Sequence, residues 1–299
     1  MASGLLISPA HALTFHITWD SSTNTAPSGF ISAFKDAVAF YHNSFTNAAT
    51  INLSVGWGEV GGTPLDTNVL GGSSFGEVGT TYAKVSSALA NGPVYLPPTD
   101  PTGGRTIYMS TANAEVLGFK GLSPGSIGGS VGFDSMATWA FNPNQRAQVG
   151  AYDFIGVAEH EISEVLGRYS ALNPGCTSGS SCPEAVLDLF RYTKASTLDL
   201  TGTSAYFSMN GGHTAINSFY GKASGGDLGD WSGPTVDSFN YAVGTGVELP
   251  VSNGDLQEMA SLGYTLAAPV PEPAQAVFML VGIGLVGWRR WRKASGYRA

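Results

Sequence analysis

The residues of this chain best suited to chemistry are a histidine and two glutamates within five positions. Residues 160–168 read HEISEVLGR, so His160 and Glu164 stand four positions apart and Glu161 directly follows the histidine. In the HExxH motif both histidines bind zinc from one helical face, and the glutamate takes a proton from the metal-bound water. Here Glu164 replaces the second histidine. Because a carboxylate oxygen is an accepted zinc ligand, the spacing still predicts a metal site with Glu161 as the general base.

A helix must present these side chains, and the surrounding residues favour one. At about 100° per residue, His160, Glu164 and Gly167 gather on one side. The opposite side collects the apolar residues Phe154, Ile155, Ala158, Ile162, Val165, Leu166 and Tyr169. Asp153 is a candidate N-cap, and Gly167 allows a sharp exit or a close backbone approach. The alternative is a solvated helix face that carries Glu159, Glu161, Glu164 and Arg168, with His160 incidental.

A third protein ligand must come from elsewhere in the chain. His213 follows two glycines, and Asp227 and Asp230 lie in the segment GGDLGD. Such loops could fold back over the helix, and His213 is the preferred third zinc ligand because imidazole is the better donor. The two aspartates could equally cap turns or bind calcium, a cation that prefers oxygen ligands.

The elements around the motif predict an α+β fold. Alternating or striped apolar residues indicate strands and helices. The strands are expected at 15–19, 51–57, 106–110 and 131–133, and the helices at 27–45, 82–89 and 112–117. We expect a small mixed sheet packed on two main helices, followed by an irregular, loop-rich C-terminal subdomain that ends with a segment at 255–264. One domain then spans residues 13–268.

Composition and charge limit which classes of molecule the chain can bind. Charged residues make up 12% of the chain and there are 40 glycines, which predicts many turns and loops. Five of the 14 basic residues lie in the last 11 positions, and the chain before them carries 9 basic and 22 acidic residues. A body this acidic excludes nucleic acid as a partner, since phosphate binding needs a positive footprint.

Other catalytic patterns fail. Residues 121–125 read GLSPG, but Pro124 has no N–H for the oxyanion hole that the GxSxG motif requires. The chain has no P-loop, Rossmann fingerprint or CxxC pair. Its two cysteines, Cys176 and Cys182, flank a short loop, and in an oxidising compartment we expect a disulfide between them.

The C-terminal tail combines three features in order. Val270-Pro271-Glu272-Pro273 precedes the apolar stretch 274–288, which ends on an arginine-rich cluster. This stretch predicts membrane insertion before processing, with the basic end in the cytoplasm. The tail, residues 269–299, resembles the PEP-CTERM sorting signal of Gram-negative bacteria. That resemblance implies processing by an exosortase and export to the cell surface or the extracellular matrix.

The N-terminal residues also suggest export. Leu5, Leu6 and Ile7 lead to Ala10-His11-Ala12, which is similar to a signal-peptidase site, although no basic residue precedes it. We interpret residues 1–12 as the remnant of a signal peptide whose start codon is assigned too late. The mature chain would then begin near Leu13.

Several blocks of the body together resemble a family of bacterial metzincin-like metalloproteases that often carry the PEP-CTERM tail. These blocks are residues 17–20, 152–157, 160–168, 225–231 and 262–264. The resemblance implies a metzincin-like fold and zinc-dependent hydrolysis of proteins or peptides, with His160 as a ligand and Glu161 as the base. The chain departs from the family's HExxHxxGxxH pattern at Glu164 and at Ser170, where histidines are expected. Two alternatives therefore remain: a non-catalytic surface or matrix protein on a degenerate protease fold, and an adhesin that binds polysaccharide.

Overall fold

So glycine-rich a chain is expected to have many turns, and most of the described strands in the computed structural model are short. It describes residues 13–172, 182–221, 227–233 and 236–267. The α-helices are α1 (Phe30–Ser44), α2 (Tyr82–Leu89), α3 (Thr111–Val116), α4 (Phe154–Val165) and α5 (Asn253–Ser261). The strands are β1 (Thr14–Trp19), β2 (Thr50–Trp57), β3 (Glu59–Val60), β4 (Thr63–Pro64), β5 (Gly71–Phe75), β6 (Glu77–Thr80), β7 (Ile107–Ser110), β8 (Gly128–Phe133), β9 (Trp139–Ala140), β10 (Tyr152–Asp153), β11 (Glu184–Ala185), β12 (Arg191–Lys194), β13 (Thr197–Leu198) and β14 (Tyr206–Phe207).

The largest sheet is mixed and has the order β1-β2-β8-β5. β1, β2 and β8 run parallel, and β5 pairs antiparallel with β8 at the edge, with Ser73 opposite Val131. The apolar alternation that predicted β2 buries Ile51, Leu53 and Val55. β5 was not predicted, because its sequence GGSSF contains no apolar alternation.

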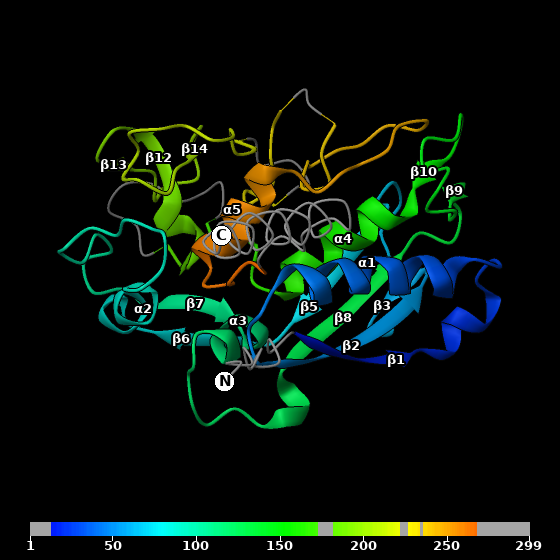
Figure 1. The fold of residues 1–299 in the computed structure, drawn as a ribbon, viewed down its shortest axis with the longest axis horizontal. Coiled ribbons are helices and arrows are strands. Elements are labelled where there is room, and N and C mark those ends of the chain that lie inside the picture. Colours follow the sequence, from blue (N-terminus) through cyan, green and yellow to red (C-terminus); the bar gives the residue numbers. More distant parts are fainter. Residues whose placement is uncertain (1–12, 173–181, 222–226, 234–235, 268–299) are drawn as a thin grey trace, which may run out of the picture. The chain divides into compact units, whose positions relative to one another are not determined.

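Two helices cover one face of this sheet. α1 and α4 contact each other, and α4 also contacts β5 and β8 (Figure 1). The apolar stripe predicted for α1 is largely buried: Phe30, Phe34, Ala37, Tyr41 and Phe45 are covered, and Val38 is partly buried. Phe30 lies at the centre, with ring centroids 5.0 Å from Trp57 and 5.2 Å from Phe154. The mixed α+β architecture is thus confirmed as small sheets with several helices.

The chain after α4 has little regular structure among its described residues. It forms the small antiparallel sheet β13-β12-β14, long connecting loops and α5. α5 begins with a capping box, in which Ser252 and Asp255 bind each other's backbone N–H groups, and it covers the first seven residues of the predicted segment 255–264. The compact unit that these elements form extends to Leu266.

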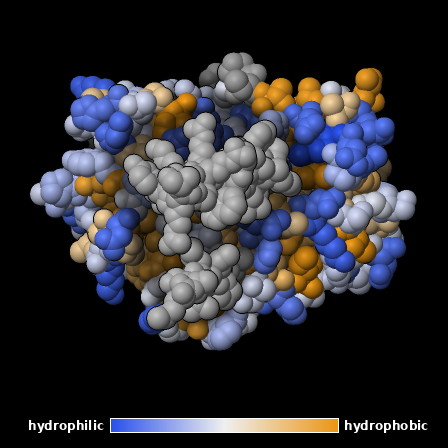
Figure 2. Space-filling model, in the orientation of Figure 1, coloured by the Kyte–Doolittle hydropathy of each residue, from blue (hydrophilic) through white to orange (hydrophobic). Residues whose placement is uncertain are grey.

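Exposed apolar side chains are scattered on the face drawn in Figure 2. Outside the atoms drawn in grey, hydrophobic and hydrophilic residues alternate over short distances. Scattered apolar residues of this kind are normal for a water-exposed surface and do not indicate a partner.

Candidate metal centre

The motif residues lie on α4, and the helix is buried on both faces. Its apolar residues pack against the sheet and α1, as predicted. The alternative of a solvated polar face is wrong, because Glu159, Glu161 and Arg168 are only 4%, 6% and 0% exposed. Burial of so many ionisable groups on one helix needs compensation by hydrogen bonds and opposite charges.

Both ends of α4 are held by specific contacts. Asp153 stands at the N-cap position but does not cap the helix, contrary to the prediction. Its carboxylate instead accepts hydrogen bonds from Arg146 Nε at 2.9 Å and Leu249 N at 2.8 Å. At the other end, Gly167 has φ +108°, and a Cβ there would lie 2.7 Å from Asn113 Cβ. Glycine thus provides the predicted sharp exit and close approach.

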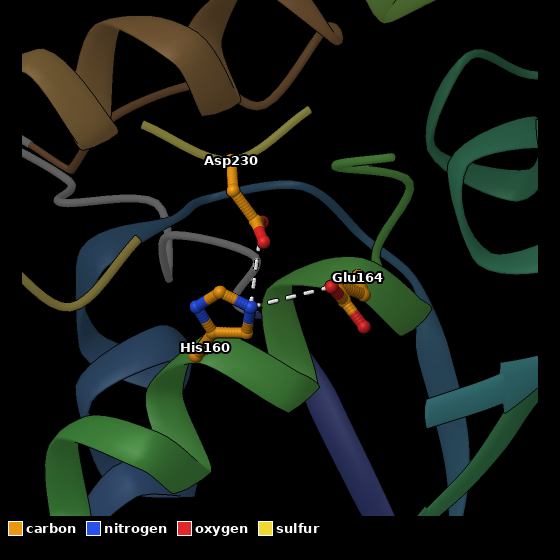
Figure 3. Close-up of side chains that lie close together, drawn as sticks. All are labelled: His160, Glu164 and Asp230. Carbon is orange, nitrogen blue, oxygen red and sulfur yellow. Dashed lines mark ion pairs between the residues drawn. The ribbon is translucent and has the colours of Figure 1, made fainter. Parts of the chain in front are cut away.

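Three side chains converge above this helix. His160 and Glu164 project from α4, and Asp230 comes from a loop that crosses over it (Figure 3). His160 Nε2 lies 3.3 Å from Glu164 Oε1 and 3.4 Å from Asp230 Oδ1. One ligand atom from each residue lies within 4.8 Å of the other two, so the three could hold a single metal ion.

His160 is oriented by its second nitrogen. Nδ1 lies 2.9 Å from the carbonyl oxygen of Ser238, so an N–H at Nδ1 donates to that carbonyl and Nε2 faces the two carboxylates. A backbone acceptor behind a histidine is the usual way in which proteins fix the tautomer of a metal ligand. Burial and Arg168 lower the pKa of His160, but Asp230 and Glu164 outweigh them and raise it to about 9.

Glu164 is held from both of its oxygens. Ser73 on β5 donates its hydroxyl to Oε2 at 2.7 Å, and Arg168 Nη2 lies 3.6 Å from Oε1. Burial raises the pKa of Glu164, but its hydrogen bond to His160 and the charges of His160 and Arg168 lower it to about 2. The carboxylate is therefore ionised and directed at the point where the three side chains meet.

Arg168 is a fully buried cation behind the group. Nη1 lies 2.7 Å from Asp230 Oδ1, Nε donates to Ser163 Oγ at 2.6 Å, and the guanidinium lies 4.4 Å from the centre of the Phe239 ring. One guanidinium thus touches both carboxylates of the group and keeps Glu164 and Asp230 close together despite their like charges.

The loop that delivers Asp230 is anchored at the end of α4. Asp227 Oδ1 accepts hydrogen bonds from the backbone N–H of Ser170 at 2.9 Å and of Gly229 at 2.6 Å. Asp227 therefore caps a turn, which is one of the roles considered for it. Ser170, at the position where the family pattern has its third histidine, contributes its backbone to this anchor, and Asp230 then completes the group.

Glu161 lies beside the three converging side chains and packs directly against the backbone of a glycine. Its carboxylate approaches Gly71 on β5 so closely that a Cβ at Gly71 would lie 2.6 Å from Glu161 Oε1. Within the described residues this carboxylate makes no hydrogen bond, and burial, with the charge of Glu164 next, raises its pKa well above the usual value.

A cavity of about 750 Å³ opens in front of these residues. Its walls include His160, Glu161, Glu164, Asp230 and the start of β5 at Gly71 and Gly72. The group is thus accessible to a ligand, while the residues that hold it are buried.

The remaining sequence predictions fall elsewhere. His213 is exposed and is not part of the converging group, so Asp230 takes the place for which His213 was preferred. Cys176 lies outside the described residues, and its predicted disulfide with Cys182 stays a prediction. The N-terminal segment 1–12 and the apolar stretch 274–288 also lie outside them. No helix in the described part of the chain is long and apolar enough to cross a membrane.

Comparison with known proteins identifies only the tail. The family model of the PEP-CTERM protein-sorting motif matches residues 269–293. No curated protein and no solved structure matches the chain. The motif indicates export from a Gram-negative cell, sorting to the cell surface or the extracellular space, and processing of the tail by an exosortase.

Proposed function

We propose that the chain is an exported, metzincin-like zinc endopeptidase with a variant HExxE motif. The observation that carries the proposal is the convergence of His160 Nε2, Glu164 Oε1 and Asp230 Oδ1 beside Glu161, in the wall of an open cavity. The export signal fits an enzyme that acts outside the cell. Transient anchoring in the inner membrane through residues 274–288 is part of the same proposal.

The donor set fits zinc. One imidazole nitrogen and two carboxylate oxygens are accepted zinc ligands, and a three-residue set leaves a position open, as catalytic sites do. Each ligand is also held by a further contact, as is usual in metal sites. Ser238 O orients His160, Ser73 Oγ orients Glu164, and Arg168 orients Asp230. A zinc ion held here would supply Lewis acidity for the carbonyl and would acidify water.

Glu161 has the properties of the general base. It borders the cavity, makes no hydrogen bond within the described residues, and has a pKa that burial raises well above the usual value. A raised pKa makes the ionised carboxylate a stronger acceptor of protons. Glu161 would take a proton from the attacking water and give it to the departing amine nitrogen.

β5 offers a place for the peptide backbone. Among the described strands it is the outermost of its sheet, and its residues Gly71 and Gly72 line the cavity. An unpaired strand edge can bind an extended peptide by backbone hydrogen bonds, independently of the peptide's side chains. Such binding would place a peptide bond next to Glu161.

The proposal is tested by metal analysis together with hydrolysis. Purified protein should contain close to one zinc per chain by mass spectrometry, and His160→Ala and Asp230→Asn should lose it. Glu161→Gln should retain zinc yet lose hydrolysis of a casein substrate. Hydrolysis by Glu161→Gln at the rate of the unmodified protein would falsify the mechanism.

One observation favours a second candidate, a non-catalytic surface protein. The raised pKa of His160 keeps it cationic, so His160 and Arg168 together balance the charges of Glu164 and Asp230 without any metal. A folded protein that takes up neither zinc nor calcium at millimolar concentration would establish this candidate instead.

A further inference from the structure

The walls of the cavity are acidic. Its lining includes six carboxylic acids, His160, which lies against two of them, and, within the described residues, no lysine or arginine. These acids are Asp66, Asp134, Glu161, Glu164, Asp227 and Asp230. Glu164 and Asp230 are proposed metal ligands, Glu161 is the proposed base, and Asp227 is engaged with backbone N–H groups. Asp66 and Asp134 have no such role.

Asp134 is held in place at the end of the central strand. It directly follows β8, and its N–H donates to Leu70 O at 2.9 Å, next to the first residue of β5. One carboxylate oxygen accepts the N–H of Met136 at 2.8 Å, which leaves the other available for a ligand. Asp66, which is exposed, lies in the loop before β5 and lines the same cavity.

Apolar side chains share the lining with these acids. Leu65, Val69, Leu70, Met136 and Val243 all border the cavity. A side chain that suits both kinds of wall has an aliphatic stem and a cationic end, as lysine and arginine have. Charge complementarity of this kind gives specificity, because a cation gains and an anion loses affinity in an acidic cavity.

We propose that the cavity selects peptides with a lysine or arginine side chain next to the scissile bond, and that Asp134 recognises the cationic end, with Asp66 assisting from the rim. Glu161 in the same wall is only 6% exposed and makes no hydrogen bond within the described residues, which is a further sign that a ligand enters this cavity. The substrate class rests on the proposed peptidase activity, whereas the charge selection can be tested without it.

The test uses the full, zinc-loaded chain and two fluorogenic peptides. Next to the scissile bond, one carries lysine and the other norleucine, which has a similar aliphatic stem without the charge. We expect kcat/KM to be about tenfold higher for the lysine peptide, the size of one charge-assisted hydrogen bond. Asp134→Asn should reduce this ratio to about two. Asp36→Asn, which removes an exposed acid on α1, should leave the ratio unchanged. Equal rates for both peptides, or a preference for lysine that Asp134→Asn leaves intact, would overturn the proposal.

A binding measurement separates this proposal from the peptidase proposal. The same peptides, labelled, are titrated with the Glu161→Gln protein and followed by fluorescence anisotropy. Tighter binding of the lysine peptide that is lost in Asp134→Asn supports charge selection even if neither peptide is hydrolysed. Equal affinity for both peptides, or no binding of either, overturns it even if a different substrate is cleaved.

Discussion

Gly71 illustrates how a residue without a side chain can define a site. β5 approaches α4 so closely at this position that a methyl group would displace the Glu161 carboxylate. The backbone φ of Gly71 is not in the left-handed region, so the glycine serves the close approach and not a turn. The proposed base and the strand edge can touch the same ligand only because of this contact.

Gly71→Ala should therefore lower activity with little effect on folding. The flexible end of Glu161 can move aside, so we expect kcat/KM to fall at least about tenfold while the melting temperature changes by only a few degrees. Gly72→Ala is the matched control, since its Cβ would meet Leu65 and Val60 on the other side of the strand. Equal loss of activity in both variants would contradict the assigned role of Gly71.

Asp227 shows how one side chain positions another. Its Oδ1 accepts both Ser170 N and Gly229 N, and this anchor brings the loop to the end of α4. Asp227→Ala should weaken zinc binding about tenfold or more, because Asp230 would no longer be held in place. Asp227→Asn should bind zinc nearly as well as the unmodified protein, since its amide oxygen can accept both hydrogen bonds. Isothermal titration calorimetry with zinc compares the two variants. Weak zinc binding by both would show that the negative charge of Asp227, and not its hydrogen bonds, supports the site.

At the scale of elements, the α1–α4 contact supports the site through its aromatic core. Phe30 on α1 packs against Trp19, Trp57, Phe133, Phe141 and Phe154, which come from the sheet, from α4 and from the loop before α4. A single side chain thus joins every layer beneath the metal group.

Phe30→Ala should cost about 3–5 kcal/mol of unfolding free energy, because it opens a cavity among buried rings. Ile31→Ala, at the adjacent and 44% exposed position, should cost less than about 1 kcal/mol. Urea denaturation followed by tryptophan fluorescence gives both values. A loss of similar size in the two variants would show that this core is not specifically packed.

At the scale of the whole molecule, the interior holds several carboxylic acids whose pKa is raised. Burial is the largest cause in each case, and it raises the pKa of Glu159 to about 8, of Asp188 to about 6 and of Asp255 to about 7. The charge of Asp237 adds to the effect at Asp255. In the folded protein these groups bind protons that the unfolded chain releases near pH 4.

The stability of the chelator-treated protein should therefore fall as the pH rises from 5 to 9. A group with a raised pKa contributes stability below its unfolded pKa and loses that contribution as the pH passes its folded pKa. For Asp255 the window runs from about 4 in the unfolded chain to about 7 in the folded protein. In Asp255→Asn, the unfolding free energy lost between pH 5 and pH 9 should be smaller by on the order of 1 kcal/mol or more. Asp36→Asn should leave this loss unchanged. Urea denaturation at several pH values measures it, and stability that increases toward pH 9 would contradict the assignment.

The sequence alone determined the local parts of this protein. Apolar periodicity predicted α1, β2, α2 and α4, because the spacing of apolar residues within one segment indicates which face of a helix or strand is buried. The spacing of His160 and Glu164 is likewise local, since one helical turn places them together. The tail motif is read from consecutive residues, and its match at 269–293 confirms the predicted export signal.

Tertiary structure decided which distant residues join them. Asp230 and not His213 meets His160, because Asp227 binds the backbone at Ser170 and this contact spans 57 positions. β5 has no apolar pattern, yet pairing with β8 places Gly71 against Glu161. Arg168 directly follows Gly167 at the predicted end of the helix. It is buried because Asp230 and Phe239, from a later segment of the chain, pack against it. Each of these contacts depends on hydrogen bonds and packing between segments far apart in the chain, which spacing within one segment does not encode.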